Sequence, residues 1–124
     1  MATQMDVINW LQENVEDLEQ NSPTSFSFRK LVESGRGQDV YFEVMESLLL
    51  ISSPFGHATQ ISSDVALNLV SENTALGMRK VGDFFAISHI VPILDLDESE
   101  LLSGIHLVGE IADELESMIG DDNF

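Results

Sequence analysis

Acidic side chains are the most abundant groups in this sequence that could bind a metal ion or transfer a proton. The chain has 22 Asp and Glu residues, four of which lie close together at Asp95, Asp97, Glu98 and Glu100. Their spacing does not follow the Asp-x-Asp-x-Asp-Gly pattern of a calcium-binding loop with its terminal glutamate. A helix N-terminus, whose dipole favours negative charge, explains this group better, and no pair of carboxylates stands out as a general acid and base.

Residues that serve as nucleophiles, metal ligands or phosphate ligands are scattered. The serine pairs at 52–53 and 62–63 lack the Gly-x-Ser-x-Gly elbow, and the glycines at 35 and 37 form only Gly-x-Gly without the lysine of a phosphate-binding loop. There is no cysteine, and the three histidines fall in a predicted loop, strand and helix: His57, His89 and His106. We therefore expect no catalytic residue, no metal and no cofactor, and a function other than catalysis.

The composition is that of a folded but strongly acidic protein. The 124 residues are 44% hydrophobic and carry a net charge of −17, which predicts one domain over 1–120 and a short acidic tail over 121–124. So many negative charges repel phosphates and anionic lipid, so we expect no nucleic acid and no membrane as partners, and a basic or apolar polypeptide instead. The N-terminus lacks a basic region and the apolar runs are short, which favours a cytoplasmic protein.

The longest predicted element is a helix that begins after Asp97 and ends at Gly120. Apolar residues recur along it at steps of three and four, which is the pattern of one buried helical stripe. They are Leu101, Ile105, Val108, Ala112, Leu115 and Ile119. Because this stripe must be covered, we expect the rest of the fold to pack against it.

The remaining elements are predicted by periodicity and by turn residues. Thr3 and Asp6 predict the start of a first helix that runs to about Gln20. Strands are expected over 26–31, 40–44 and 48–52, and residues 54–57 are expected to end this series of strands. A helix is then expected to begin after Ser62 or Ser63. A hairpin over 77–90 turns at 82–83. The predicted fold is α+β, in the order α-β-β-β-α-β-β-α, with an antiparallel sheet packed against helices.

Basic residues are confined to the predicted strands and their turns. They are Arg29, Lys30, Arg36, Arg79 and Lys80. The helices thus form an acidic surface, which serves either solubility or the attraction of a basic or unfolded polypeptide.

Apolar residues in the strands exceed what a small sheet under three helices needs. The candidate contact residues are Leu48, Leu49, Leu50, Ile51, Phe55, Phe84 and Phe85. Burial in the core is the commoner fate of such residues. Where exposed at a strand edge, they suit the addition of an extended peptide as an extra strand, or a symmetric dimer.

Several short motifs are similar to those of a known superfamily. They are the strand pair ending in Leu48-Leu49-Leu50-Ile51-Ser52-Ser53-Pro54-Phe55-Gly56, the helix Ala66-Leu67-Asn68-Leu69-Val70-Ser71-Glu72-Asn73, the hairpin from Gly77 to Ile90, and the helix start Asp95-Leu96-Asp97-Glu98-Ser99-Glu100-Leu101. Together the segment from Val40 to Ile119, about two thirds of the chain, resembles the bacterial superfamily shared by type III secretion chaperones of the Tir chaperone kind and YbjN-like proteins.

The resemblance implies a small acidic protein, usually a homodimer, without catalytic residues. In the secretion-chaperone branch such a protein holds an extended segment of another protein along its surface, and in the YbjN-like branch its role is regulatory or peptide-binding. We therefore expect a non-enzymatic protein of this kind. The alternative from the residues themselves is a small-molecule-binding or enzymatic module that uses a carboxylate cluster.

Overall fold

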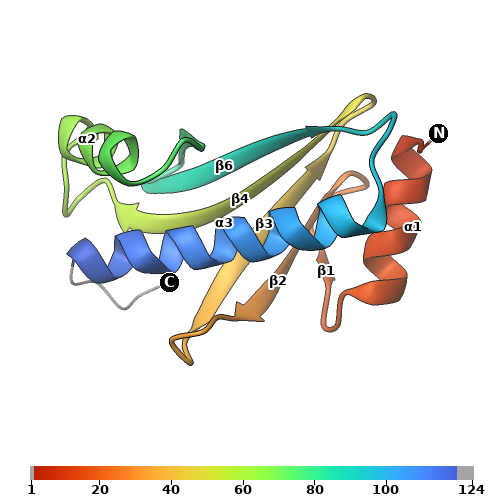
Figure 1. The fold of residues 1–124 in the computed structure, drawn as a ribbon, viewed down its shortest axis with the longest axis horizontal. Coiled ribbons are helices and arrows are strands. Elements are labelled where there is room, and N and C mark those ends of the chain that lie inside the picture. Colours follow the sequence, from red (N-terminus) through yellow and green to blue (C-terminus); the bar gives the residue numbers. More distant parts are fainter. Residues whose placement is uncertain (1, 120–124) are drawn as a thin grey trace.

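The protein is an α+β fold in which three helices pack on a six-stranded antiparallel sheet (Figure 1). The computed structural model describes residues 2–119. In chain order the elements are α1 (Gln4–Asn14), β1 (Glu19–Gln20), β2 (Ser25–Leu31), β3 (Gly37–Val44), β4 (Leu48–His57), α2 (Ser63–Asn73), β5 (Gly77–Val81), β6 (Phe84–Pro92) and α3 (Glu98–Ile119). The strands are arranged β1-β2-β3-β4-β6-β5, which places β4 and β6 inside the sheet. The predicted fold class is confirmed.

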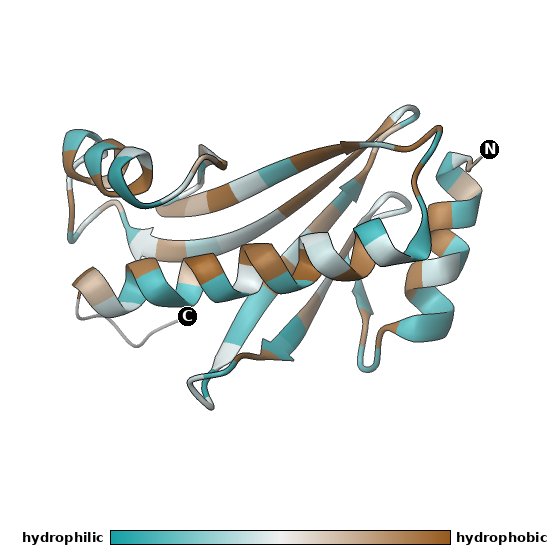
Figure 2. Cartoon of the chain, in the orientation of Figure 1, coloured by the Kyte–Doolittle hydropathy of each residue, from teal (hydrophilic) through white to brown (hydrophobic). Residues whose placement is uncertain are grey.

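The long helix α3 lies across the sheet as its apolar stripe requires (Figure 1). Asp97 caps the helix, since its Oδ1 atom accepts a hydrogen bond from the Glu100 backbone N–H at 2.8 Å. The residues of the stripe that precede Ile119 are all buried, and Figure 2 shows apolar and polar residues alternating along the helix. The predicted end at Gly120 and the tail over 121–124 lie outside the described residues.

All three helices cover the same face of the sheet. Buried residues of α1, α2 and α3 belong to one core, together with alternate residues of the strands. On the strands this core comprises Phe26, Val40, Phe42, Val44, Leu49, Ile51, Phe55, Phe85, Ile87 and Val91. The side chains between them therefore point to the opposite face, because successive residues of a strand alternate.

The first helix is shorter than the sequence predicts. Thr3 and Asp6 form the expected capping box, but α1 ends at Asn14 instead of about Gln20. No basic residue lies in its last turn, and the following segment is acidic, so the helix dipole gains nothing there. Asp17 then adopts a left-handed conformation with φ of 57°, and the chain continues as the short strand β1, which the predicted order lacks.

Strand β4 continues beyond its predicted end. Residues 54–57 were expected to close the strand run, yet β4 extends to His57. Its pairing with β6 is irregular between Pro54 and Gly56. Its pairing with β3 ends at Ser52, and the Pro54 carbonyl accepts a hydrogen bond from the Gln38 side chain at 2.6 Å, so the missing N–H of Pro54 breaks no bond between β3 and β4.

Candidate functional site

The sheet has one face that no described helix covers, and we call it the open face. The strand register defines it, because residues paired across neighbouring strands share a face. Tyr41 pairs with Ser52, and Ala86 pairs with both Pro54 and Arg79. The open face comprises Glu19, Ser25, Ser27, Arg29, Leu31, Asp39, Tyr41, Glu43, Leu48, Leu50, Ser52, Pro54, Arg79, Val81, Phe84, Ala86, Ser88 and Ile90.

A groove of about 570 Å³ runs over the open face, and its lining is mostly apolar. Its floor consists of small or buried side chains, including Ser52, Pro54 and Ala86. Larger residues line it toward both sides of the sheet, with Tyr41 44% exposed and Phe84 39% exposed. We call this hollow the open-face groove. Strand β4 is buried from Leu49 to Gly56 although helices cover only one of its faces, because larger side chains stand around it on the open face.

The open face is nearly neutral in a protein of net charge −17. It carries three carboxylates and two guanidinium groups, and Arg29 forms an ion pair with Asp39 at 2.9 Å. Glu43 accepts hydrogen bonds from the hydroxyl groups of Ser25 and Thr24, the latter at 3.2 Å. Among residues 2–119, Arg79 forms no ion pair. The excess negative charge therefore lies elsewhere, largely on the helices.

Tyr41 has an altered pKa that reflects its place beside the groove. Burial raises the pKa of the Tyr41 phenol above its ordinary value of 10.0, and the negative charges of Asp39 and Glu19 raise it further, while Arg29 opposes them. The phenol is therefore neutral at pH 7, and its hydroxyl is a hydrogen-bond donor in the wall of the groove.

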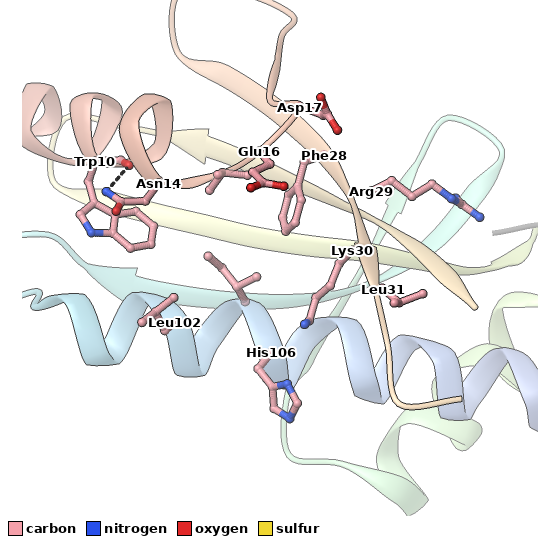
Figure 3. Close-up of a pocket in the computed structure, with 12 residues that line it drawn as sticks. Trp10, Asn14, Glu16, Asp17, Phe28, Arg29, Lys30, Leu31, Leu102 and His106 are labelled. Atoms are coloured by element: carbon pink, nitrogen blue, oxygen red, sulfur yellow. Dashed lines mark hydrogen bonds between the residues drawn. The ribbon is translucent and has the colours of Figure 1, made fainter. Parts of the chain in front are cut away.

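A second hollow, of about 500 Å³, lies between the end of α1, strand β2 and helix α3 (Figure 3). We call it the edge groove. Figure 3 shows Phe28 and Lys30 pointing from β2 toward α3, with Trp10 on α1 at one end and Leu102 and His106 on α3. Asn14 donates a hydrogen bond to the backbone oxygen of Trp10 at 2.9 Å, the dashed line in the figure.

The edge groove borders a stretch of unpaired strand. β1 pairs only with Phe26 and Ser27, so within the described part of the chain residues 28–31 of β2 have no strand on their outer side. Leu31 is 72% exposed and Leu102 is 52% exposed beside this free edge. An unpaired strand next to exposed apolar side chains is the arrangement that accepts an additional strand.

The predicted contact residues separate into two groups. Leu48, Leu50 and Phe84 lie on the open face, and the last two line the open-face groove. Leu48 and Phe84 are exposed there, whereas Leu50 is buried in the floor. The other four are almost fully buried in the core and are not available for contact with a partner: Leu49, Ile51, Phe55 and Phe85. Sequence reasoning missed Tyr41 and Val81. For Tyr41 the signal was its alternation with the core residues Val40 and Phe42 of β3. Val81 lies on β5, which has no buried core residue, and only its pairing with Phe84 places it beside the groove.

Charged groups are few in the open-face groove, where Glu43 and Arg79 line it, and more numerous in the edge groove, which Glu16, Asp17, Lys30 and His106 line. The ring of His57 lies 4.9 Å from that of Phe84, whereas His106 lines the edge groove on the other side of the sheet. Residues 2–119 hold no group of three or more His, Cys, Asp or Glu side chains suited to a metal ion. Over the same residues, no helix is long and apolar enough to cross a bilayer.

Comparisons with protein-family models, with curated proteins and with solved structures find no significant match to this chain.

Proposed function

We propose that this protein is a non-enzymatic binding protein that holds a segment of another polypeptide in its open-face groove. The observation that carries the proposal is an apolar, nearly neutral hollow on the helix-free face of the sheet, in a chain of net charge −17. Exposed apolar surface of this kind marks contact with other molecules. The acidic helices on the opposite side would keep the complex in solution.

The edge groove suits an extended part of the same partner. A strand added beside residues 28–31 of β2 would receive backbone hydrogen bonds, and its side chains would contact Trp10, Leu31 and Leu102. A chaperone-like or regulatory role, a homodimer and a cytoplasmic location belong to the same proposal, which agrees with the resemblance drawn from the sequence. Light scattering at micromolar concentration tests the homodimer directly.

A small-molecule-binding or enzymatic module is the alternative. It would need carboxylates that converge on an apolar pocket so that one acts as acid and another as base. The lining of the open-face groove contains a single carboxylate, that of Glu43, so binding without chemistry has the better support there. Glu16, Asp17 and His106 line the edge groove, which is where the alternative would apply.

The proposal is tested by co-purification of the tagged full-length protein, with mass spectrometry of the retained partner. Phe84→Asp places a charge in the wall of the open-face groove and should reduce the retained partner by about tenfold. Leu102→Asp alters the edge groove and should weaken retention less. Leu49 is unsuitable for this purpose, because it is fully buried and its substitution would unfold the protein.

A matched control is Met5→Asp, which adds a carboxylate at an exposed apolar residue of α1 outside both grooves. This variant should retain the partner as the unaltered protein does. Equal retention by the Phe84→Asp protein, with its thermal unfolding unchanged, contradicts a role for the open-face groove.

A further inference from the structure

We infer that the open-face groove takes an amphipathic helix with an acidic residue beside its apolar stripe, rather than an extended strand. This inference rests on the proposed function, because it names the form of polypeptide that occupies the same groove. Three observations support it: the pairing of the inner strands, the low and high side chains that shape the groove, and the position of Arg79.

The floor of the groove offers few backbone groups for hydrogen bonds with a ligand. It is formed by β4 and β6, which pair with each other, and its residues Ser52 and Ala86 are paired on both sides. The Pro54 carbonyl accepts a hydrogen bond from the Gln38 side chain. The backbone N–H and C=O groups of an extended segment on this floor would be buried against side chains and would lack hydrogen-bond partners, which is unfavourable. A helix satisfies these groups internally, so it can lie on this floor without backbone partners from the sheet.

The shape of the groove also favours a helix. Small residues at Ser52, Pro54 and Ala86 leave the floor low, while Tyr41 and Phe84 stand higher on either side. Large apolar side chains that project from one face of a helix fill such a hollow at positions i, i+3, i+4 and i+7.

The charged residues at two corners of the groove set the direction of the bound helix. Arg79 on β5 and Glu43 on β3 both line the groove, at diagonally opposite corners. Arg79 aligns with Pro54 through Ala86, and Glu43 aligns with Leu50, so the two corners are roughly 20 Å apart at ordinary strand spacings. About 13 residues of helix span that distance. Because acids favour the first turn of a helix and bases the last, the helix should begin near Arg79 and end near Glu43.

Selection from a display library tests the inference with a defined probe. Random peptides of about 16 residues, displayed on phage, are selected against the immobilised full-length protein, and each enriched peptide is tested against variants. We expect enriched sequences with a helical apolar period and an acid near the start. Phe84→Asp should weaken them by about tenfold and Arg79→Gln by about fivefold, whereas Met5→Asp should leave binding unchanged.

The possible outcomes separate the two proposals. Peptides that depend on Phe84 but alternate apolar and polar residues, or that bind equally well when proline interrupts them, overturn the helix and keep the groove. Binding that Phe84→Asp leaves unchanged, or no enrichment over an unrelated protein, overturns both. Circular dichroism of each variant shows whether it is folded, and Val81→Asp at the exposed rim replaces Phe84→Asp if that variant unfolds.

Discussion

A single arginine joins the β2–β3 turn to the far end of the long helix. The Arg36 guanidinium forms an ion pair with Asp113 Oδ1 at 2.8 Å, and it donates hydrogen bonds to the Asp113 backbone oxygen at 3.4 Å and to Ser117 Oγ. The Asp113 side chain is only 8% exposed. A carboxylate so far from water is tolerated because a cation lies against it. This contact explains how a helix with no basic residue in its last turn is held at that end.

Removing this arginine should destabilise the protein. Arg36→Ala leaves a buried carboxylate without its cation, and we expect the free energy of unfolding to fall by about 2–3 kcal/mol. Urea denaturation followed by circular dichroism measures the change. The double variant Arg36→Ala with Asp113→Asn should recover part of the loss, because the uncompensated charge is gone. A loss of less than about 0.5 kcal/mol in the single variant would mean that the ion pair contributes little.

At the scale of the elements, the approach of α3 to the sheet depends on a glycine. A Cβ atom added at Gly104 would lie 3.0 Å from Ile51 Cδ1 and 3.4 Å from His89 Cδ2. Gly109, one and a half turns along the same helix, faces the flexible Lys30 side chain, with Cδ at 3.0 Å. The two glycines therefore differ in whether the neighbouring group can move aside.

A matched pair of substitutions separates these two effects. Gly109→Ala should stabilise the protein by about 0.5–1 kcal/mol through helix propensity, since Lys30 can yield. Gly104→Ala should gain nothing or lose stability, because Ile51 is a core residue with no freedom to shift. Urea unfolding of both variants measures the difference. Equal stabilisation by the two substitutions would show that the close packing of α3 on β4 at Gly104 does not affect the free energy of unfolding.

The start of the same helix should respond to pH. Hydrogen bonds from the Glu100 backbone N–H and from the Ser99 hydroxyl lower the pKa of Asp97 below its ordinary value of 3.8. A lowered pKa in the folded state means that the carboxylate stabilises the protein above the ordinary pKa, and that this contribution is lost as the pH falls through the lowered value.

Thermal unfolding of Asp97→Ala tests this linkage. At pH 7 the variant should unfold at a lower temperature than the unaltered protein, and the gap should narrow as the pH falls below 3.8. Asp97→Asn, which keeps a capping oxygen but does not titrate, should unfold closer to the unaltered protein at pH 7. A gap that stays constant over this pH range rules out the carboxylate as its source.

For the whole molecule, the balance of charge sets the response to salt. A net charge of −17 on a 124-residue chain produces self-repulsion that screening by ions relieves. We expect the midpoint of thermal unfolding to rise by about 5 °C between low salt and roughly 0.5 M NaCl. A midpoint that does not rise would show that the acids are too dispersed to matter.

The local pattern of the sequence determined the elements of this protein. The stripe from Leu101 to Leu115, the caps at Thr3, Ser62 and Asp97, and the turn at 82–83 depend on neighbours within a few residues, so the sequence predicts them. The confinement of all five basic residues to strands and turns was equally visible. The end of α1 at Asn14 was not, because a left-handed Asp17 and pairing with β2 decided it.

Only the tertiary structure decided which apolar strand residues are available to a partner. The continuous run Leu48-Leu49-Leu50-Ile51 hides the alternation between two faces, and nothing local says which face the helices cover. That choice depends on the register of β4 against β3 and β6, which brings Tyr41 and Phe84 to the same groove from segments more than forty residues apart. Contacts of such long range are fixed by how the whole sheet pairs and packs, and a local pattern does not contain them.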